Sequence, residues 1–376
     1  MLRRPGRGEY RCVHAGLFIL LAVTLIGCAS RPGPDVLAPV AAAPGVKTVP
    51  IYVATTRKRA APEVNVFTAE RSDALNFAKF VVAIPPGHKP GNIEWPKGSP
   101  DSRVDFVTVD QTGLSEATFR DAVAPVRQRG KKRDVAVFVH GFNNNFQESL
   151  YRFAQITADS GINATPVLFA WPSQADAGGY DGDKNAATHS RDQLMELLAM
   201  LTSSPQVGEI LVVAHSMGGF LTAEALRELR VQHRDRVIAR LGRVVLAAPD
   251  IDVDDFRAQV QTIGPLKPPL TVLVSKDDAA LRVSNLVGGS RARAGALDIN
   301  NPLVQEAALK AKVRVIDISQ LQSTDGRMKH DRFVNLAALY PRLQELPAAE
   351  RQVSGTFLLD AANARPVEVS GPPPPN

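Results

Sequence analysis

Cysteine is nearly absent from this sequence of 376 residues, which contains two, Cys12 and Cys28. Both lie close to the N-terminus, so a disulfide-stapled fold or a cysteine-ligated metal site is excluded for the rest of the chain. Long apolar runs are missing as well: the main one, residues 17–26, is far shorter than the roughly 20 residues of a membrane-spanning helix. The sequence also lacks a Walker loop, a dinucleotide-binding fingerprint and a His/Cys cluster, so we expect no cofactor and no metal.

A strong excess of charge of one sign is also missing from most of the chain. The formal net charge is +6 and the pI is near 9.4, which would suit a nucleic-acid partner. However, residues 1–27 contain four arginines and one glutamate and contribute +3 of that charge. The other lysines and arginines are interspersed with acids, as on a solvated surface, so we expect no nucleic acid among the partners.

The N-terminus has the pattern of an export signal. Arginines precede the apolar run of residues 17–26, which closes on Leu25-Ile26-Gly27-Cys28. This ending resembles the lipobox of bacterial lipoproteins, which implies that the preceding segment is removed and that Cys28 becomes a lipidated first residue. Several acyl chains make such an anchor stable. Because Ala29-Ser30 lacks the aspartate that retains many lipoproteins in an inner membrane, we expect an envelope lipoprotein on the periplasmic face of the outer membrane.

Short β-branched runs alternate with helix-length amphipathic segments through most of the chain. The runs are residues 135–139, 167–169, 210–213, 244–247, 270–274 and 313–316, and the clearest helical segments are residues 147–159, 192–201 and 219–230. This alternation predicts an α/β fold with a mostly parallel central sheet flanked by helices. Three earlier runs, residues 51–54, 79–84 and 104–109, have no clear helices between them, so we expect them to extend the sheet with antiparallel strands.

One motif carries a chemical prediction. It reads Ile210-Leu211-Val212-Val213-Ala214-His215-Ser216-Met217-Gly218-Gly219, a buried-strand pattern that leads into a small-x-Ser-x-small turn and then a helix. This order is typical of a nucleophile elbow. The turn must be tight to hold the serine hydroxyl clear of the sheet, and Ala214 and Gly218 are small enough to allow it. We therefore predict that Ser216 is a catalytic nucleophile.

A serine nucleophile needs a base within hydrogen-bonding reach and an acid that fixes the tautomer of the base. In enzymes with such an elbow, the acid and then the histidine follow the serine along the chain. Of the 7 histidines, only His330 lies beyond the next two predicted strands, and it stands in a polar loop. Elimination therefore selects His330 as the base. His215, inside the elbow, is expected to point away from the nucleophile.

The acid is expected in the loop after the strand 271–274, which reads Ser275-Lys276-Asp277-Asp278. Asp278 is preferred, and Asp277 is the neighbouring alternative. Asp250, after the strand 244–247, is a further alternative, because some enzymes of this kind place the acid one strand earlier.

Negative charge that develops on a carbonyl oxygen needs preorganised N–H donors. The backbone N–H of Met217 comes with the elbow and is the first expected donor. The second is the N–H of Phe142, in the loop His140–Asn145 after the strand 135–139, where Gly141 lets the backbone turn sharply.

With these pieces together, the chain resembles the uncharacterised bacterial α/β-hydrolases labelled as esterase/lipase superfamily enzymes of unknown function. The resemblance spans about residues 48 to 345 and rests on Tyr52-Val53-Ala54-Thr55-Thr56-Arg57, Val82-Ala83-Ile84-Pro85 with His88, Val139-His140-Gly141-Phe142-Asn143, Trp171-Pro172-Ser173, Tyr180, Asp183, the elbow, Ala248-Pro249-Asp250, the stretch from Ser275 to Leu281, and His330. It implies the α/β-hydrolase fold and supports Asp278, because the acid of the family precedes one residue and then Ala-Leu. The sequence departs from the family at Met328-Lys329, where a small residue commonly precedes the histidine.

The expected domain organisation follows from these observations. It consists of a lipoprotein signal peptide (residues 1–27), a Pro/Ala-rich tether (28–46), an α/β-hydrolase domain (47–346) made of an N-terminal β extension (47–125) and a catalytic core (126–346), and a flexible C-terminal tail (347–376).

The predicted activity is a serine hydrolase that cleaves a carboxylic ester, of a small molecule or a lipid, through an acyl-enzyme intermediate. An acyltransferase or a peptidase on the same three residues is an alternative. A non-catalytic envelope lipoprotein that uses the fold as a binding module is another.

Overall fold

The computed structural model of the chain describes residues 31–125, 132–287, 291–326, 328–345 and 347–369. The expected signal peptide, Cys28 and the last residues of the expected tail therefore lie outside the described residues. Within the described ranges, no helix has both the length and the apolar character that a membrane crossing requires.

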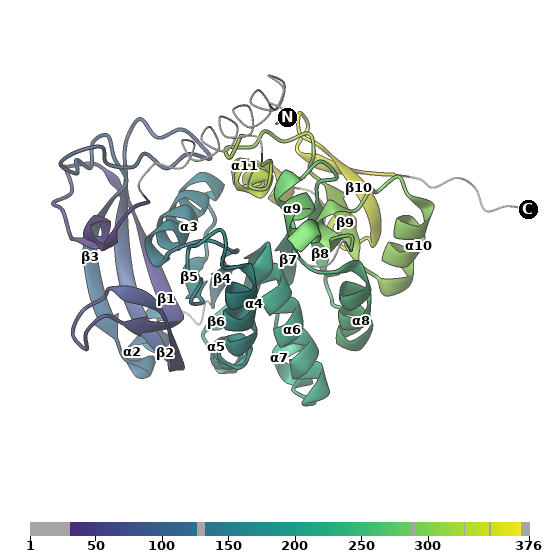
Figure 1. Cartoon of the computed structure of the whole chain (residues 1–376), viewed down its shortest axis with the longest axis horizontal. Coiled ribbons are helices and arrows are strands. Elements are labelled where there is room, and N and C mark those ends of the chain that lie inside the picture. The colour runs from purple at the N-terminus through teal and green to yellow at the C-terminus, as the bar shows by residue number, and fades with distance from the viewer. Residues whose placement is uncertain (1–30, 126–131, 288–290, 327, 346, 370–376) are drawn as a thin grey trace, which may run out of the picture.

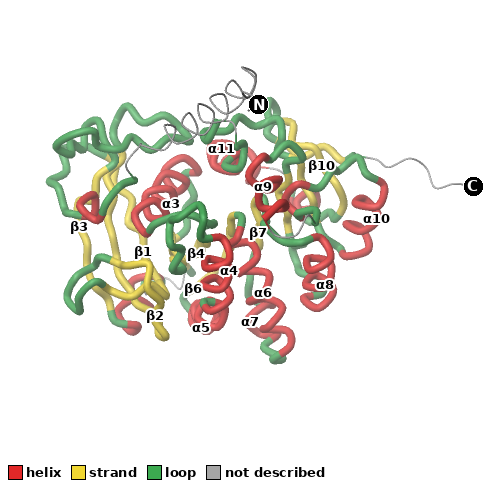
Figure 2. Tube along the Cα trace, in the orientation of Figure 1, coloured by secondary structure: helices red, strands yellow, loops and turns green. Residues whose placement is uncertain are grey.

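One 11-stranded sheet forms the centre of the molecule (Figures 1 and 2). Its strands are β1 (Lys47–Arg59), β2 (Phe67–Ile84), β3 (Val107–Leu114), β4 (Arg133–Val139), β5 (Thr165–Ala170), β6 (Val207–His215), β7 (Arg243–Ala247), β8 (Thr271–Val274), β9 (Arg314–Asp317), β10 (Gly355–Asp360) and β11 (Arg365–Glu368). They lie in the order β11-β10-β9-β8-β7-β6-β4-β5-β1-β2-β3. Every pair from β10 to β1 is parallel, and the outer pairs β10/β11, β1/β2 and β2/β3 are antiparallel. The predicted mostly parallel sheet with N-terminal antiparallel strands is confirmed, although β3 begins three residues later than expected.

Helices cover both faces of this sheet. The helical elements are η1 (Pro34–Leu37), α2 (Glu116–Val123), α3 (Phe146–Ser160), α4 (Tyr180–His189), α5 (Arg191–Ser203), α6 (Met217–Val231), α7 (Asp235–Ala239), α8 (Val253–Ile263), α9 (Ala279–Val287), η3 (Ala294–Ala296), α10 (Pro302–Ala311), α11 (Arg332–Leu336), η4 (Ala337–Leu339), α12 (Tyr340–Glu345) and α13 (Ala348–Arg351). Side chains of α5, α6 and α8 share a core with Val137, and side chains of α3 and α11 share a second core with Phe138. Since adjacent residues of a strand point to opposite faces, a stretch buried on both sides is apolar throughout, as residues 135–139 of β4 are.

The segment expected to be a free tether packs against the domain where it is described. Leu37, in η1, is 1% exposed. The Tyr151 hydroxyl donates to the carbonyl oxygen of Val36 over 2.7 Å, and the N–H of Val40 donates to the carbonyl oxygen of Thr108 over 2.8 Å. The prediction of an extended tether is therefore wrong for residues 31–46, because one buried leucine and these hydrogen bonds fix a segment whose composition alone suggests flexibility.

The expected flexible tail also contains structure. Strand β10 pairs in parallel with β9, and β11 turns back antiparallel to β10. Phe357 and Leu359 of β10 are buried in the same core as α3. The physical reason is that β9 would otherwise present an unpaired edge, which β10 covers. The domain therefore extends past residue 346, and the boundary expected there is wrong.

Candidate active site

Ser216 occupies a strained turn at the carboxyl end of β6. Its backbone has φ 54° and ψ −121°, a region that residues with a Cβ rarely adopt and that is characteristic of constrained functional positions. Two neighbours make this turn possible. A Cβ at Gly218 would lie 2.3 Å from the carbonyl oxygen of His140, and one at Gly219 would lie 3.1 Å from Pro249. Only glycine lets α6 begin this close to β4, so the expected elbow geometry is present at Ser216.

The predicted base and the preferred acid are hydrogen-bonded to each other. The imidazole Nδ1 of His330 lies 2.7 Å from Oδ2 of Asp278, which is fully buried. The other carboxylate oxygen of Asp278 accepts the N–H of Leu281 over 2.9 Å, as the N-cap of α9. The loop after β8 and the loop after β9 thus meet at the carboxyl edge of the sheet, next to the elbow.

This pairing changes the acidity of the base. Burial, the largest single effect, acts to lower the pKa of His330. The hydrogen bond and negative charge of Asp278, together with the charges of Asp250 and Asp325, outweigh burial, and the net effect raises the pKa of His330 above its ordinary value. The imidazolium that forms when His330 accepts a proton is therefore stabilised by the site.

The two alternative acids have other partners. Asp277 pairs with Arg332 and with Lys329, the latter at 2.8 Å between Oδ2 and Nζ. The hydrogen bond from Arg332 is the main reason why the pKa of Asp277 lies well below its usual range. Since Lys329 and Arg332 flank His330, Asp277 holds the loop that carries His330.

Asp250 lies in a different buried network. Its carboxylate accepts hydrogen bonds from the hydroxyls of Tyr180 over 3.0 Å and Ser284 over 2.6 Å, and lies 3.3 Å from Nε of Arg293. Among the described residues, Asp278 is the carboxylate that hydrogen-bonds to the imidazole of His330.

The side chain of His215 contacts the loop that carries His330. Its ring packs against that of His330, with centroids 4.6 Å apart, and against Phe333 at 4.3 Å. Nε2 of His215 lies 3.2 Å from the carbonyl oxygen of His330. Burial keeps the pKa of His215 well below its ordinary value, so the ring is neutral, and a carbonyl partner requires the proton on Nε2. His215 therefore supports the loop of His330, because side chains alternate along β6 and place it on the face shared with α11.

The loop His140–Asn145 follows β4 and lies against the elbow. A Cβ at Gly141 would lie 2.8 Å from Nδ1 of His215 and 3.0 Å from Cβ of Ser216. Phe142 follows Gly141 directly in this loop. Among the described residues, neither the N–H of Phe142 nor that of Met217 donates a hydrogen bond to another protein group.

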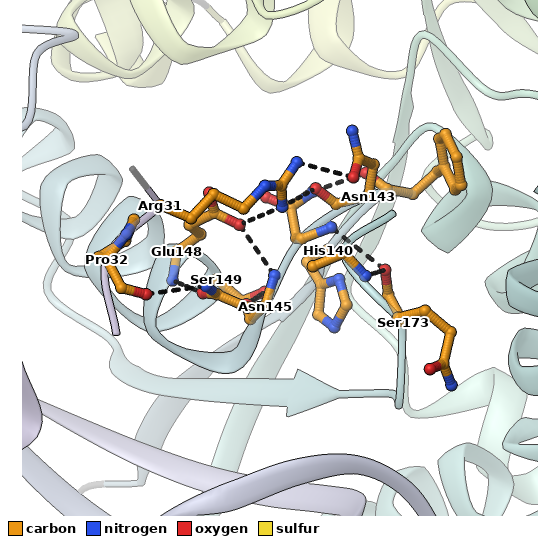
Figure 3. A network of polar contacts seen from close by, with 12 residues as sticks. Arg31, Pro32, His140, Asn143, Asn145, Glu148, Ser149 and Ser173 are labelled. Atoms are coloured by element: carbon orange, nitrogen blue, oxygen red, sulfur yellow. Dashed lines mark hydrogen bonds and ion pairs between the residues drawn. The ribbon is translucent and has the colours of Figure 1, made fainter. Parts of the chain in front are cut away.

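Hydrogen bonds fix this loop from several sides, as Figure 3 shows. Asn143 has φ 60°, and the N–H of Asn144 donates to Oγ of Ser173 over 3.2 Å. The side chain of Asn145 accepts the N–H of Glu148 over 2.8 Å, and Glu148 in return accepts the N–H of Asn145 over 2.9 Å. This reciprocal cap begins α3 directly after the loop.

Three buried polar residues behind the loop were given no role by the sequence. Arg57, at the end of β1, is 1% exposed and donates to the carbonyl oxygen of Asn144 over 2.9 Å. Asp183 accepts from the hydroxyl of Ser173 over 2.5 Å and from the N–H of Asn143 over 3.4 Å. Burial lowers the pKa of Arg57 to about 10, so it remains charged. The sequence did contain a signal for Arg57. It is a charged residue near the end of β1, and it closes the motif Tyr52 to Arg57 on which the family resemblance rests.

His140 has a structural role in the same region. Its ring stacks on Trp171 with centroids 4.9 Å apart, and its two ring nitrogens lie about equally close to the carbonyl oxygens of Gly141 (2.9 Å) and Trp171 (3.0 Å). Burial lowers the pKa of His140 to about 3, which keeps it neutral. Within the described part of the chain, no group of His, Cys, Asp and Glu has the arrangement of a metal site.

Comparison with known proteins adds a family. A family model described as "Alpha/beta hydrolase of unknown function (DUF900)" matches residues 115–347. No curated protein sequence matches the chain.

Solved structures similar to this one include three esterolytic enzymes. The esterase Est22, in a mutant form, is 10% identical with a TM-score of 0.39 and covers 91% of this chain and 89% of its own. A fungal esterase from Rhizomucor miehei is 10% identical with a TM-score of 0.35 and covers 78% of this chain and 84% of its own. A cutinase from Trichoderma reesei is 14% identical with a TM-score of 0.24 and covers 34% of this chain and 57% of its own. The family match, and not these distant similarities, identifies the fold.

Proposed function

Because the chain belongs to the α/β hydrolases of unknown function known as DUF900, we propose that it is a serine hydrolase that cleaves carboxylic esters with Ser216, His330 and Asp278. The observation that carries the proposal is the 2.7 Å hydrogen bond between His330 and the buried Asp278, beside a serine held at φ 54°. A strained serine, an oriented imidazole and a buried carboxylate are the parts that nucleophilic acyl transfer requires.

The reaction proceeds in two halves. In the first, Nε2 of His330 accepts the proton of the Ser216 hydroxyl as Oγ attacks the carbonyl carbon of the ester. His330 then donates that proton to the departing alcohol oxygen, which leaves an acyl group on Ser216. In the second half, a water oxygen attacks the acyl carbonyl carbon while His330 accepts a proton from that water. His330 then returns the proton to Oγ of Ser216 as the acyl–oxygen bond breaks and the carboxylic acid is released.

The protein stabilises the charge that develops in both halves. The N–H groups of Met217 and Phe142 donate hydrogen bonds to the carbonyl oxygen and stabilise its negative charge. Removing one such donor typically lowers kcat by about 10²–10³-fold. Met217 is also the first residue of α6, so the positive end of the helix dipole lies at the oxyanion. Asp278 keeps the proton of the neutral ring on Nδ1 and stabilises the imidazolium.

The location of the protein follows from the sequence. Cys28 would carry the lipid anchor, and the protein would be attached to the periplasmic face of the outer membrane. The substrate would then be an ester present in the envelope.

Labelling of the folded protein with a fluorophosphonate tests the proposal. We expect stoichiometric modification at Ser216, none in Ser216→Ala, and turnover of a short-chain ester by the unmodified protein. Absence of labelling would contradict the proposal and favour a non-catalytic binding module. Labelling with turnover only when an alcohol or amine acceptor is present would indicate an acyltransferase, and cleavage of amides in preference to esters would indicate a peptidase.

A further inference from the structure

An apolar surface on α9 borders the candidate site and has no described partner. Val283, Leu286 and Val287 are 52%, 73% and 60% exposed, and their i, i+3, i+4 spacing places them on one side of the helix. The opposite side holds Leu281 and Ser284, which are buried. Clustered exposure of large apolar side chains on one helix face marks an interaction surface, whereas single exposed ones do not. We refer to Val283, Leu286 and Val287 as the α9 surface.

The α9 surface lies close to the reacting groups. Helix α9 begins directly after Asp278, its N-cap. Its first N–H, of Ala279, donates to the carbonyl oxygen of Met328 over 2.9 Å, and Met328 itself is 42% exposed. The acid and the loop of the base thus connect the α9 surface to the site.

The N-terminal segment is fixed at the other side of the site. The guanidinium of Arg31 donates to the carbonyl oxygen and to the side chain of Asn143 over 3.0 and 2.7 Å, and pairs with Glu148 at 3.0 Å (Figure 3). The side chain of Asn145 donates to the carbonyl oxygen of Pro32 over 3.0 Å. Asn143 is adjacent to the expected oxyanion donor Phe142. Arg31 therefore lies beside this loop.

The order of strands places these two features on either side of Ser216. The loop of Asn143 follows β4, Ser216 follows β6, α9 follows β8, and the sheet runs β8-β7-β6-β4. All three are at the carboxyl edge, and Figure 1 shows α9 there next to α11. Cys28 is three residues before Arg31, so its Cα lies within roughly 11 Å of that of Arg31 at full extension.

We propose that the α9 surface rests on the lipid bilayer and that the substrate is an acyl ester of a membrane lipid, which enters the site from the membrane. The inference rests on the proposed esterase function and on the anchor at Cys28. The short connection from Cys28 to Arg31 holds the carboxyl edge of the sheet toward the membrane, and the α9 surface meets the acyl region. Arg282, which is exposed on the same helix next to Val283, would contact anionic headgroups.

The test compares two esters of the same fluorophore. One is a long-chain oleate ester dissolved in phosphatidylcholine and phosphatidylglycerol vesicles, and the other is a water-soluble acetate ester. The protein is the full lipidated chain bound to the vesicles. Its variants are the triple substitution Val283→Gln, Leu286→Gln and Val287→Gln, and an insertion of about 20 Gly/Ser residues between Ser30 and Arg31, long enough to remove the restraint on orientation.

The matched control replaces exposed apolar residues far from the site. Val231, 51% exposed, ends α6 at the opposite edge of the sheet from Ser216, and Leu309, 58% exposed, lies near the end of α10 shortly before β9 begins. The double variant Val231→Gln and Leu309→Gln should therefore turn over both esters like the unmodified protein.

The expected results separate the membrane contact from the chemistry. The triple variant should lose about tenfold or more of kcat/KM on the vesicle ester, since it removes the apolar area that would be buried in the bilayer, and the insertion should lose severalfold. Both should retain acetate turnover within about twofold, which also shows that they fold. If the triple variant loses acetate turnover, Leu286→Gln alone replaces it.

Equal rates on the vesicle ester for the unmodified protein and either variant would overturn the inference. A second result would also overturn it. If the unmodified protein sediments as a dimer in detergent and the triple variant sediments as a monomer, the α9 surface is a subunit interface. Failure of the proposed function looks different: the unmodified protein would turn over neither ester.

Discussion

Replacing Asp278 with asparagine tests the centre of the mechanism, because the structure determines which way the new amide must face. One carboxylate oxygen of Asp278 accepts the N–H of Leu281, and the other accepts the Nδ1 proton of His330. In Asp278→Asn, the amide oxygen has to keep the bond to Leu281, since a buried N–H without an acceptor is costly. The amide NH₂ group then faces His330 and can only donate a hydrogen bond. Nδ1 of His330 must therefore be unprotonated to accept it. The ring proton moves to Nε2, and the ring can no longer take the proton of Ser216.

The expected loss is large and falls on the chemical step. A triad with the wrong histidine tautomer loses about 10⁴ in kcat, which corresponds to about 5.5 kcal/mol of barrier. Stability should change little, because the amide fits the same space.

Steady-state ester hydrolysis by Asp278→Asn, Asp277→Asn and Asp250→Asn measures the difference. Asp277→Asn should have a much smaller effect, because Asp277 holds the loop through Lys329 and Arg332 and does not contact the imidazole. If Asp250→Asn abolishes turnover while Asp278→Asn does not, the acid lies one strand earlier and the reasoning is refuted.

Four further predictions follow from the same geometry. Ser216→Ala and His330→Ala should each lower kcat by up to about 10⁶, and the double variant should be scarcely worse, because the residues act as a unit; full esterase activity in folded His330→Ala would disprove the assignment. The logarithm of kcat/KM should fall on the acid side through an apparent pKa above about 6.5, because His330 must be neutral to act and its pKa is raised; a limb centred well below pH 6 in a pH–rate profile would contradict this. Arg57→Met should lower kcat about 10- to 100-fold with little change in KM, because Asn144 loses the donor that holds its loop, whereas Arg59→Met on the same strand should not; kinetics combined with thermal unfolding would show whether the effect is only on stability. Cys28→Ser should remain unprocessed or soluble, and mass spectrometry that finds an unmodified Cys28 in the mature protein would exclude the anchor.

The sequence predicted the interior of the fold better than its ends. The runs that became β4, β6, β7 and β8 are almost wholly apolar because most of their residues are buried, and that pattern is visible without a structure. Strands β10 and β11 were missed, since their short runs follow a stretch that looks like a polar tail and their pairing depends on the distant edge of β9. The docked segment 31–46 was missed for a similar reason: its position depends on single contacts such as that of Leu37.

The candidate site divides in the same way. The prediction of Ser216 rests on the elbow, which is a local motif, and that of His330 rests on elimination along the chain. The choice among Asp278, Asp277 and Asp250 could not be made from spacing alone, because all three follow strands at the same edge of the sheet. The supporting residues were the hardest, since the role of His215 depends on α11 and that of Arg57 depends on a loop 87 positions away.

The position of β1 has a consequence for where the protein can be cut. The family model begins at residue 115, yet β1 lies inside the sheet between β5 and β2, and Arg57 reaches from it to the loop His140–Asn145. A fragment of residues 115–347 would keep Ser216, Asp278 and His330 but would expose bare strand edges on both flanks, at β5 and β9. The segment recognisable by sequence is therefore smaller than the minimal folding unit. Truncation, grafting or recombination of this enzyme should take residues 31–369 as one indivisible block.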